Sequence, residues 1–189
     1  MTLPRIIVEE AVPEEVSREW VTPAEMALTR KFAPARRREA WAWRYIVRRE
    51  VGRDADIRYN EVGAPYIANY PVYISVSHSK GRVAVAFSNR KCAVDIEQLR
   101  RHFGTVKDYY LNNTELQIAE IYPNYLAEAW SAKETVFKYM GRPELDFAED
   151  IDLSIPRDGY FVVNVAGADD LVVAFEMHKD EGYVLTSIL

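Results

Sequence analysis

The 189-residue chain is 49% hydrophobic and 28% charged, which excludes an intrinsically disordered protein and predicts one domain or two small halves packed together. Its single cysteine, Cys92, excludes an intramolecular disulfide and favours the reducing cytoplasm. No apolar stretch approaches the ~20 residues of a membrane span, and no signal-peptide pattern opens the chain, so we expect no membrane partner.

The net charge of −5 is unevenly distributed along the chain. Residues 1–100 carry 17 Lys and Arg against 13 Asp and Glu, a balance of +4, whereas residues 101–189 carry 7 against 16, a balance of −9. The first half therefore suits an anionic ligand. The acidic whole, without basic residues interleaved with aromatic ones, argues against nucleic acid.

The predicted elements of the first half begin with a strand over 4–10. Thr22 and Pro23 are typical of the start of a helix over 22–32, and Pro34 and Gly52 bound a longer, arginine-rich helix over 34–52. A strand and a glycine turn follow over 56–67. Apolar residues then alternate in three runs over 72–99, which predicts an antiparallel meander of three strands.

In the second half, a short helix, a break at Asn112 and Asn113, and a helix capped by Thr114 are predicted over 105–123. A helix over 124–141 ends at Gly141, and four strands follow near 151–155, 160–165, 171–177 and 183–188. We therefore predict an α+β fold of two similar halves, 1–100 and 101–189. Each half would hold a helix and antiparallel strands, packed as a pseudo-dimer.

The helix segment WSAKETVFK, residues 130–138, places a lysine where a core residue is expected. At 100° per residue from Trp130, Lys133 falls at about 300°, between the apolar Met140 and Leu126. A buried ammonium without a partner costs several kcal/mol. Lys133 should therefore meet a carboxylate, border a cleft that holds an anion, or extend its stem along the domain edge into water.

Two further segments carry groups suited to phosphate chemistry. Asp95 and Glu97 share one face of a predicted strand, where they are either solvated or arranged around a hard cation that Glu134 could also bind. His78 in SVSHSKG stands at the end of a strand, where it either binds phosphate or completes a turn. The sequence contains no nucleophile elbow, zinc spacing, dinucleotide fingerprint or P-loop.

The order and spacing of these segments resemble the 4′-phosphopantetheinyl transferase superfamily, in its longer, pseudo-dimeric type. SVSHS resembles the family's SHS element, AVDIE its DIE element, YYLNNTE the segment that follows, and WSAKETVFK its W(S/T)xKE-x3-K element. GAPYI resembles the GKP element, with Ala64 where the family has lysine; an arginine from 36–44 or Arg82 could replace it. The likeness covers about residues 22–155.

The resemblance implies transfer of 4′-phosphopantetheine from coenzyme A to a serine of an apo acyl or peptidyl carrier protein, releasing adenosine 3′,5′-bisphosphate. It implies that Asp95, Glu97 and Glu134 hold Mg²⁺, with Mn²⁺ as the alternative metal. Glu134 would deprotonate the carrier serine, and Lys138 would stabilise the pyrophosphate. The implied coenzyme contacts are Ser77, His78, Lys133, Lys138, Arg36, Arg37 and Arg44.

For the carrier protein, we expect recognition by 98–103, with Arg100 and Arg101, and by 108–113, with Tyr110 and Leu111. An ordinary linker between the halves is the alternative for these segments. The internal duplication favours a monomer. Two other functions stay open: a catalytically silent module that binds a carrier protein or coenzyme A, and another Mg²⁺-dependent phosphodiesterase.

Overall fold

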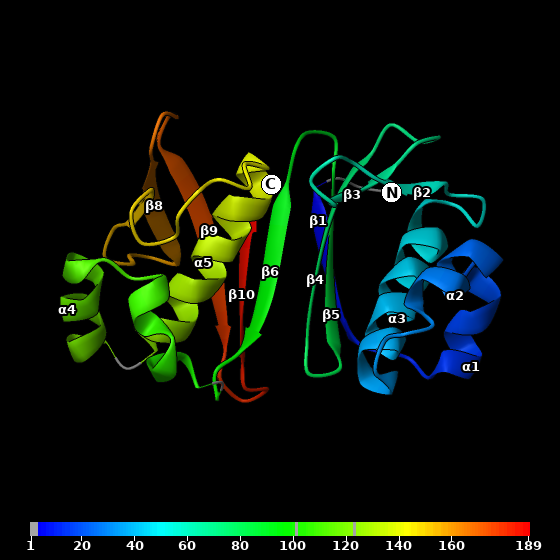
Figure 1. The fold of residues 1–189 in the computed structure, drawn as a ribbon, viewed down its shortest axis with the longest axis horizontal. Helices are drawn as coiled ribbons and strands as arrows, with labels where there is room; N and C mark the ends of the chain where they lie inside the picture. Colours follow the sequence, from blue (N-terminus) through cyan, green and yellow to red (C-terminus); the bar gives the residue numbers. More distant parts are fainter. Residues whose placement is uncertain (1–3, 101, 123) are drawn as a thin grey trace. The chain divides into compact units, whose positions relative to one another are not determined.

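The computed structural model describes residues 4–100, 102–122 and 124–189. The chain divides into two compact units: unit 1 is Met1–Cys92 with Leu189, and unit 2 is Ala93–Ile188. Each unit combines helices with antiparallel strands (Figure 1). The predicted α+β class is therefore confirmed, while the packing of two halves as a pseudo-dimer stays a prediction.

Unit 1 has one long helix packed on an antiparallel sheet with the strand order β1-β5-β4, and a separate β2-β3 hairpin. Its elements are β1 (Arg5–Glu10), α1 (Glu14–Ser17), η1 (Arg18–Trp20), α2 (Pro23–Thr29), α3 (Pro34–Val51), β2 (Ile57–Tyr59), β3 (Pro65–Ile67), β4 (Tyr73–Ser79) and β5 (Arg82–Ser88).

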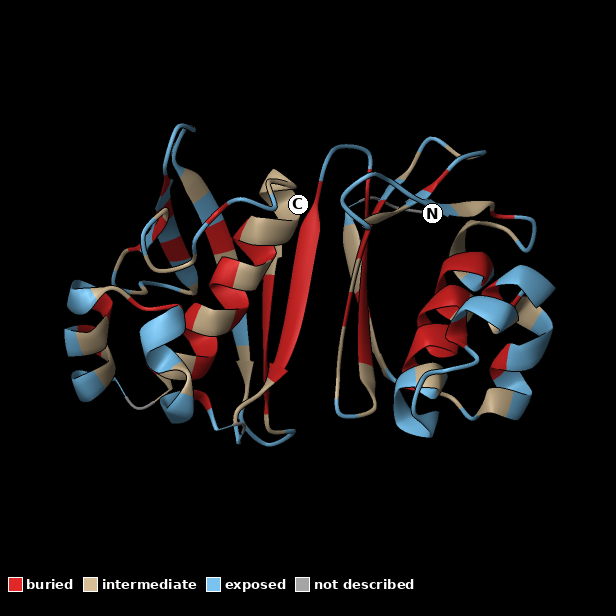
Figure 2. Ribbon diagram, viewed as in Figure 1, coloured by how far each residue is buried: buried red, intermediate tan, exposed pale blue. Residues whose placement is uncertain are grey.

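Local sequence explains the helix boundaries of unit 1. Thr22 caps α2 in a reciprocal capping box with Glu25, and Pro23 occupies the first turn. α3 likewise begins with Pro34 and ends before Gly52, whose φ of 157° suits glycine. The buried side of α3 includes Ile46 and Val47, which join the strand residues of β5 in one core (Figure 2).

Unit 2 is a five-stranded antiparallel sheet in the order β6-β10-β9-β8-β7, with α5 packed on β6, β10 and β9. Its elements are β6 (Ala93–Gln98), η2 (Phe103–Thr105), η3 (Lys107–Tyr109), α4 (Asn113–Ile121), α5 (Tyr125–Met140), β7 (Ile151–Leu153), β8 (Tyr160–Val165), β9 (Leu171–His178) and β10 (Tyr183–Ile188).

The ends of α4 and α5 follow known capping rules. Asn112, and not the predicted Thr114, caps α4: its side chain accepts the Glu115 N–H while Glu115 accepts the Asn112 N–H. α5 ends at Gly141, which is left-handed with a φ of 65°, as predicted. The core of unit 2 is formed by the inner faces of α5 and the sheet, including Ala132, Val136, Phe161 and Val173.

The predicted three-stranded meander is correct only in part. β4 and β5 pair as expected, but β6 pairs with β10 in the sheet of unit 2. The boundary therefore lies between Cys92 and Ala93 and not near residue 100. Alternation predicts that a segment is a strand, but its partner depends on segments far along the chain.

Among the described residues, no helix combines the length and the apolar character needed to cross a bilayer.

Candidate functional site

β6 brings two carboxylates to the helix α5. Asp95 and Glu97 are two residues apart on the strand, so both side chains emerge on the same face, and both contact α5 residues. Asp95 is 3% exposed and Glu97 is 9% exposed. These carboxylates therefore lie at the interface of a strand and a helix and not on a solvated face.

Both oxygens of Asp95 are bound by α5. Lys138 Nζ lies 2.7 Å from Oδ1 in an ion pair, and Ser131 Oγ donates to Oδ2 at 2.9 Å. Lys138 also donates to the Val94 carbonyl at 3.2 Å. The Lys138 side chain is 28% exposed while that of Asp95 is 4% exposed, so the pair lies at the edge of the buried region.

Glu97 accepts a hydrogen bond from Trp130 Nε1 at 3.1 Å. Glu134 follows Trp130 by four residues and Ser131 by three, so it belongs to the same side of α5 as the partners of Glu97 and Asp95. Glu134 is partly buried. Asp95 and Glu97 thus come from β6 and Glu134 from α5, two elements that pack together within unit 2.

Three carboxylates are the donors that Mg²⁺ or Mn²⁺ prefers, so the chemistry of this set fits a hard divalent cation. Within residues 4–100, 102–122 and 124–189, however, no three His, Cys, Asp or Glu side chains are already gathered as metal ligands. Lys138 supplies the positive charge against Asp95 instead. The metal assignment to Asp95, Glu97 and Glu134 stays a prediction.

Lys133 meets a carboxylate, which was the first of the three expectations for it. The side chain is fully buried, with Nζ 2.7 Å from Glu115 Oε2 and 2.7 Å from the Phe147 carbonyl. Burial lowers the pKa of Lys133, and the charge and hydrogen bond of Glu115 oppose that effect. The Lys133 side chain has no exposed surface in this structure, and the coenzyme contact expected of it stays a prediction.

Sequence analysis did not identify Glu115 as the partner of Lys133. Its Oε2 accepts the Asn112 N–H and the Lys133 ammonium, and its Oε1 accepts the Leu153 N–H at 2.8 Å. The available signal was the capping-box spacing from Asn112 to Glu115, which marks a glutamate held against a helix start. The pairing with Lys133 arises only when α4 packs beside α5.

In unit 1, the predicted histidine stands beside a buried acid that sequence analysis also missed. His78 Nδ1 lies 2.9 Å from Glu39 Oε2, and Glu39 Oε1 accepts the Gly81 N–H. Ser77 is 7% exposed on β4, whereas the His78 side chain is 31% exposed. His78 is therefore accessible on one side and held on the other.

The three arginines expected to bind phosphate have different environments. Arg44 is 3% exposed, donates to the Ala40 carbonyl and Tyr59, and lies 3.3 Å from Glu25, and its expected contact with phosphate stays a prediction. Burial lowers the pKa of Arg44 while Tyr59 and Glu25 oppose that effect.

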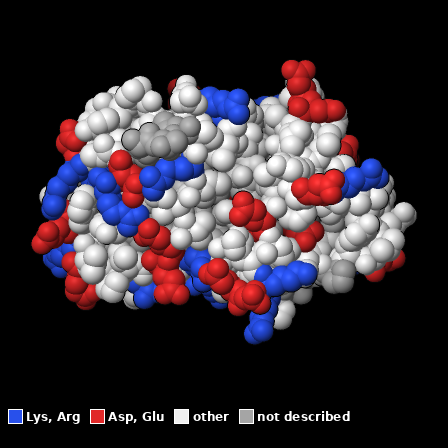
Figure 3. All heavy atoms as spheres, turned by 180° about the vertical axis from the view of Figure 1, so that it is seen from behind, with Lys and Arg blue, Asp and Glu red and all other residues white. Residues whose placement is uncertain are grey.

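Arg37 pairs with Glu14 at 2.9 Å, and the exposed Arg36 stacks over Phe32. Arg38, which was not singled out, places Nη2 beside the Gly81 turn. Basic and acidic side chains are also interspersed on the face shown in Figure 3. Ion pairing therefore neutralises much of the arginine charge that the sequence of α3 suggests.

The segments expected to meet a carrier protein are partly interior. Tyr110 is 0% exposed and Leu111 3%, and the Tyr110 hydroxyl donates to the Leu126 carbonyl. Their expected role as an exposed apolar surface is wrong, because both belong to the core of unit 2. Tyr109 is 80% exposed and Arg100 is exposed, while Arg101 lies outside the described residues.

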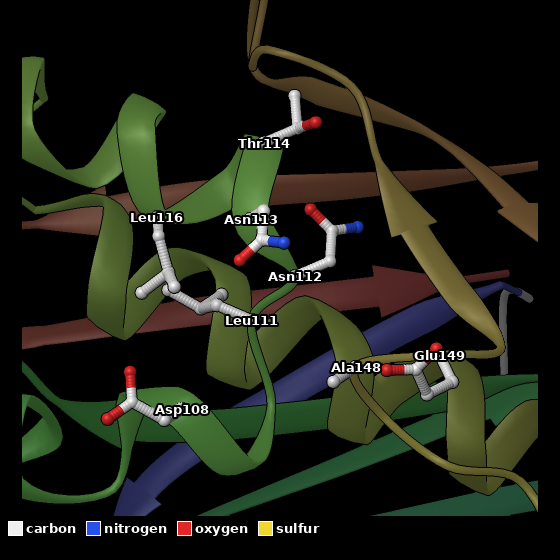
Figure 4. A pocket seen from close by; sticks show the side chains of 8 residues that line it. All are labelled: Asp108, Leu111, Asn112, Asn113, Thr114, Leu116, Ala148 and Glu149. Atoms are coloured by element: carbon white, nitrogen blue, oxygen red, sulfur yellow. The ribbon is translucent and has the colours of Figure 1, made fainter.

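An open pocket lies where α4 begins (Figure 4). Its lining consists of Asp108, Leu111, Asn112, Asn113, Thr114, Leu116, Ala148 and Glu149. The carboxylates of β6 and the site residues of α5 do not line it. The pocket is therefore distinct from the cluster of Asp95, Glu97 and Lys138, and carries no catalytic group of that cluster.

Comparison with known proteins found a family match that covers most of unit 2. Among curated proteins, none matches the chain. Residues 91–187, just over half of the chain, match the sequence model of the 4′-phosphopantetheinyl transferase superfamily, and this region contains the β6 carboxylates, Glu115 and the whole of α5. The chain therefore belongs to the 4′-phosphopantetheinyl transferase superfamily.

Proposed function

We propose that this protein is a holo-carrier-protein synthase, which transfers 4′-phosphopantetheine from coenzyme A to a serine of an apo acyl or peptidyl carrier protein. The observation that supports it best is the placement of Asp95 and Glu97 against α5, the helix that carries Lys138 and Glu134, within the region that matches the superfamily. A cluster of carboxylates with one lysine is suited to phosphoryl transfer, in which charge neutralisation and positioning do most of the work.

Asp95, Glu97 and Glu134 would hold the divalent cation, which neutralises charge on a bound pyrophosphate. Ser131 and Trp130 hold the Asp95 and Glu97 side chains in their rotamers through the hydrogen bonds at 2.9 and 3.1 Å. These neutral donors orient the carboxylates without cancelling their charge.

Glu134 would accept the proton of the carrier serine, because it is a partly buried carboxylate on the same helix as Lys138. Lys138 would move from Asp95 toward the pyrophosphate and stabilise the charge that develops on the leaving bisphosphate. Ser77 and His78 of unit 1 would contact the coenzyme. The monomeric state expected from the sequence is part of the same proposal.

The test is the intact mass of a panel of apo carrier proteins after incubation with coenzyme A, Mg²⁺ and the protein. We expect a gain of one phosphopantetheine on at least one carrier, abolished by EDTA and reduced at least ~10²-fold in rate by Glu134→Gln. Glu120→Gln is the matched control, since Glu120 is an exposed carboxylate on the neighbouring helix α4.

Other outcomes favour the alternatives. Binding of coenzyme A or a carrier without any mass gain across the panel would favour a silent binding module. Hydrolysis of phosphodiesters without transfer would favour a Mg²⁺-dependent phosphodiesterase. Equal transfer by Glu134→Gln and the wild type would remove Glu134 from the proposed chemistry.

A further inference from the structure

Glu39 is a buried carboxylate in unit 1 to which no role has been given. It lies on α3, is 7% exposed, and directs its two oxygens to two different partners. Oε2 lies 2.9 Å from His78 Nδ1, and Oε1 accepts the N–H of Gly81. One acid of a helix therefore holds both the end of β4 and the turn that follows it.

The contact defines the orientation of the histidine ring. An ionised carboxylate only accepts hydrogen bonds, so Nδ1 carries the hydrogen in the contact with Glu39. The opposite nitrogen, Nε2, then points away from Glu39, and the His78 side chain is 31% exposed while that of Glu39 is 9% exposed. Nε2 then donates a hydrogen bond to a ligand when the imidazole is protonated.

The turn beside His78 is a two-residue hairpin turn whose central residues are both left-handed. Ser79 pairs with Arg82 across it, and both Lys80 and Gly81 have positive φ, 49° and 84°. A left-handed lysine is unfavourable, so this conformation needs support from its surroundings. The Glu39 bond to the Gly81 N–H and the Ala11 N–H bond to the Gly81 carbonyl, at 2.6 Å, supply it.

The same turn gathers positive charge. Arg38, the neighbour of Glu39 on α3, places Nη2 3.2 Å from the position that a Cβ on Gly81 would take. Lys80 lies in the turn and Arg82 directly follows it. Because the carboxylate of Glu39 is buried and these cations are near the surface, the corner presents donors suited to a phosphate dianion.

We propose that Glu39 is a positioning residue for recognition of the 3′-phosphate of coenzyme A: it orients His78 and fixes the Lys80–Gly81 turn so that imidazole and cations face one phosphate monoester. This inference rests on the proposed function, because that function supplies the ligand. Glu39 itself does not touch the phosphate.

The test measures binding, so that it does not depend on the choice of carrier protein. Calorimetry would compare adenosine 3′,5′-bisphosphate with adenosine 5′-monophosphate for the wild type, Glu39→Gln, Glu39→Asp and Glu14→Gln. Glu14→Gln is the control because Glu14 also pairs with a cation of α3, Arg37. We expect Glu39→Gln to weaken the bisphosphate about tenfold and to leave the monophosphate unchanged. For Glu39→Asp, we expect an affinity for the bisphosphate between those of the wild type and Glu39→Gln.

A second readout follows the imidazole directly. In the wild type, the His78 Nδ1–H should give a hydrogen-bonded proton resonance that shifts when the bisphosphate is added and not when the monophosphate is added. Glu39→Gln should change that resonance, whereas Glu14→Gln should not. If Glu39→Gln does not fold, the wild-type response alone decides, since absence of a bisphosphate-specific shift contradicts the proposal.

The outcomes separate this inference from the proposed function. An equal loss of affinity for both nucleotides, or no loss for either, overturns the role of Glu39 even if transfer to a carrier is observed. Selective loss of bisphosphate binding, in a protein that modifies no carrier, supports Glu39 and contradicts the transferase proposal.

Discussion

At the scale of single residues, the buried ion pair of Lys133 and Glu115 connects three segments of unit 2. Glu115 lies in the first turn of α4, Lys133 lies on α5, and the Phe147 carbonyl and Leu153 N–H of the segment after α5 complete the network. Breaking a buried pair costs more than its formation contributes, because the remaining charge loses its compensation.

We therefore expect Lys133→Met to lower the free energy of unfolding by about 3–5 kcal/mol, and Lys133→Met with Glu115→Gln to recover a large part of it. Urea unfolding measures both. Because Lys133 is fully buried, the folded double variant should keep the wild-type affinity for coenzyme A. A single variant of unchanged stability that no longer binds coenzyme A would instead favour a direct contact.

Cys92, the only cysteine in the sequence, should react slowly. It is 7% exposed, and burial raises the pKa of its thiol to about 11 from 9.0. Since the thiolate is the reactive form, native Cys92 should react with a disulfide reagent at pH 8 roughly a hundredfold more slowly than in the unfolded chain. Equal rates before and after denaturation, followed by absorbance, would contradict this burial.

At the scale of elements, α2 and α3 are joined by one carboxylate. Glu25 receives two hydrogen bonds from Arg48, at 2.9 and 3.0 Å, and completes the capping box with Thr22. Burial raises the pKa of Glu25, but the hydrogen bonds of Arg48 and Thr22, with the charges of Arg48 and Arg44, lower it overall. The same acid therefore caps one helix and attaches it to the next.

The network around Glu25 predicts part of the loss of folding stability at acid pH. Because the folded pKa of Glu25 is depressed below 4.5, its stabilisation is present above pH 4.5 and is lost as the pH falls through the folded pKa. We expect Glu25→Gln to lower stability at pH 7 by about 3 kcal/mol and to flatten the decline below pH 4.5. Urea midpoints from pH 7 to 2.5 measure this.

Glu19→Gln provides the control for that series. Glu19 is 78% exposed and lies 3.6 Å from Arg53, and such an exposed ion pair contributes little to stability. A decline for Glu25→Gln that parallels the wild type would mean that other groups cause the acid unfolding.

At the scale of the whole molecule, the two compact units carry net charges of opposite sign. Residues 1–92 contain 16 Lys and Arg against 11 Asp and Glu, or +5, and residues 93–188 contain 8 against 18, or −10. The proposed contacts of the 3′-phosphate therefore belong to the basic unit, whereas Lys138 and the proposed metal ligands belong to the acidic one. The 3′-phosphate of the coenzyme and the divalent cation would each meet the unit of opposite charge.

Binding of coenzyme A should accordingly weaken with salt. Raising the ionic strength from about 0.05 to 0.5 M shortens the screening length severalfold, and we expect the Kd for coenzyme A to rise at least about fivefold. Pantetheine, which lacks the phosphates, is the control and should show little change. A salt-independent Kd would argue that apolar contacts dominate coenzyme binding.

Much of the fold was predictable from local patterns. The two ends of α3 were marked by Pro34 and Gly52, and the end of α5 was marked by Gly141. These signals are local, because caps and backbone conformations depend on neighbouring residues. The four strands of the second half also agree with their alternation. The pairing of β6 with β10 was not predictable, because alternation is the same whichever strand lies alongside.

The sequence by itself determined the family and the α+β class, since these depend on residue type, order and spacing, and it predicted Asp95, Glu97 and Glu134 as metal ligands. Only the tertiary structure decided which charged groups are already engaged with one another. It placed Lys133 on Glu115, Arg44 beside Glu25, and His78 on Glu39. The physical reason is that a charge takes its partner from whatever packing brings within about 4 Å, often many residues away.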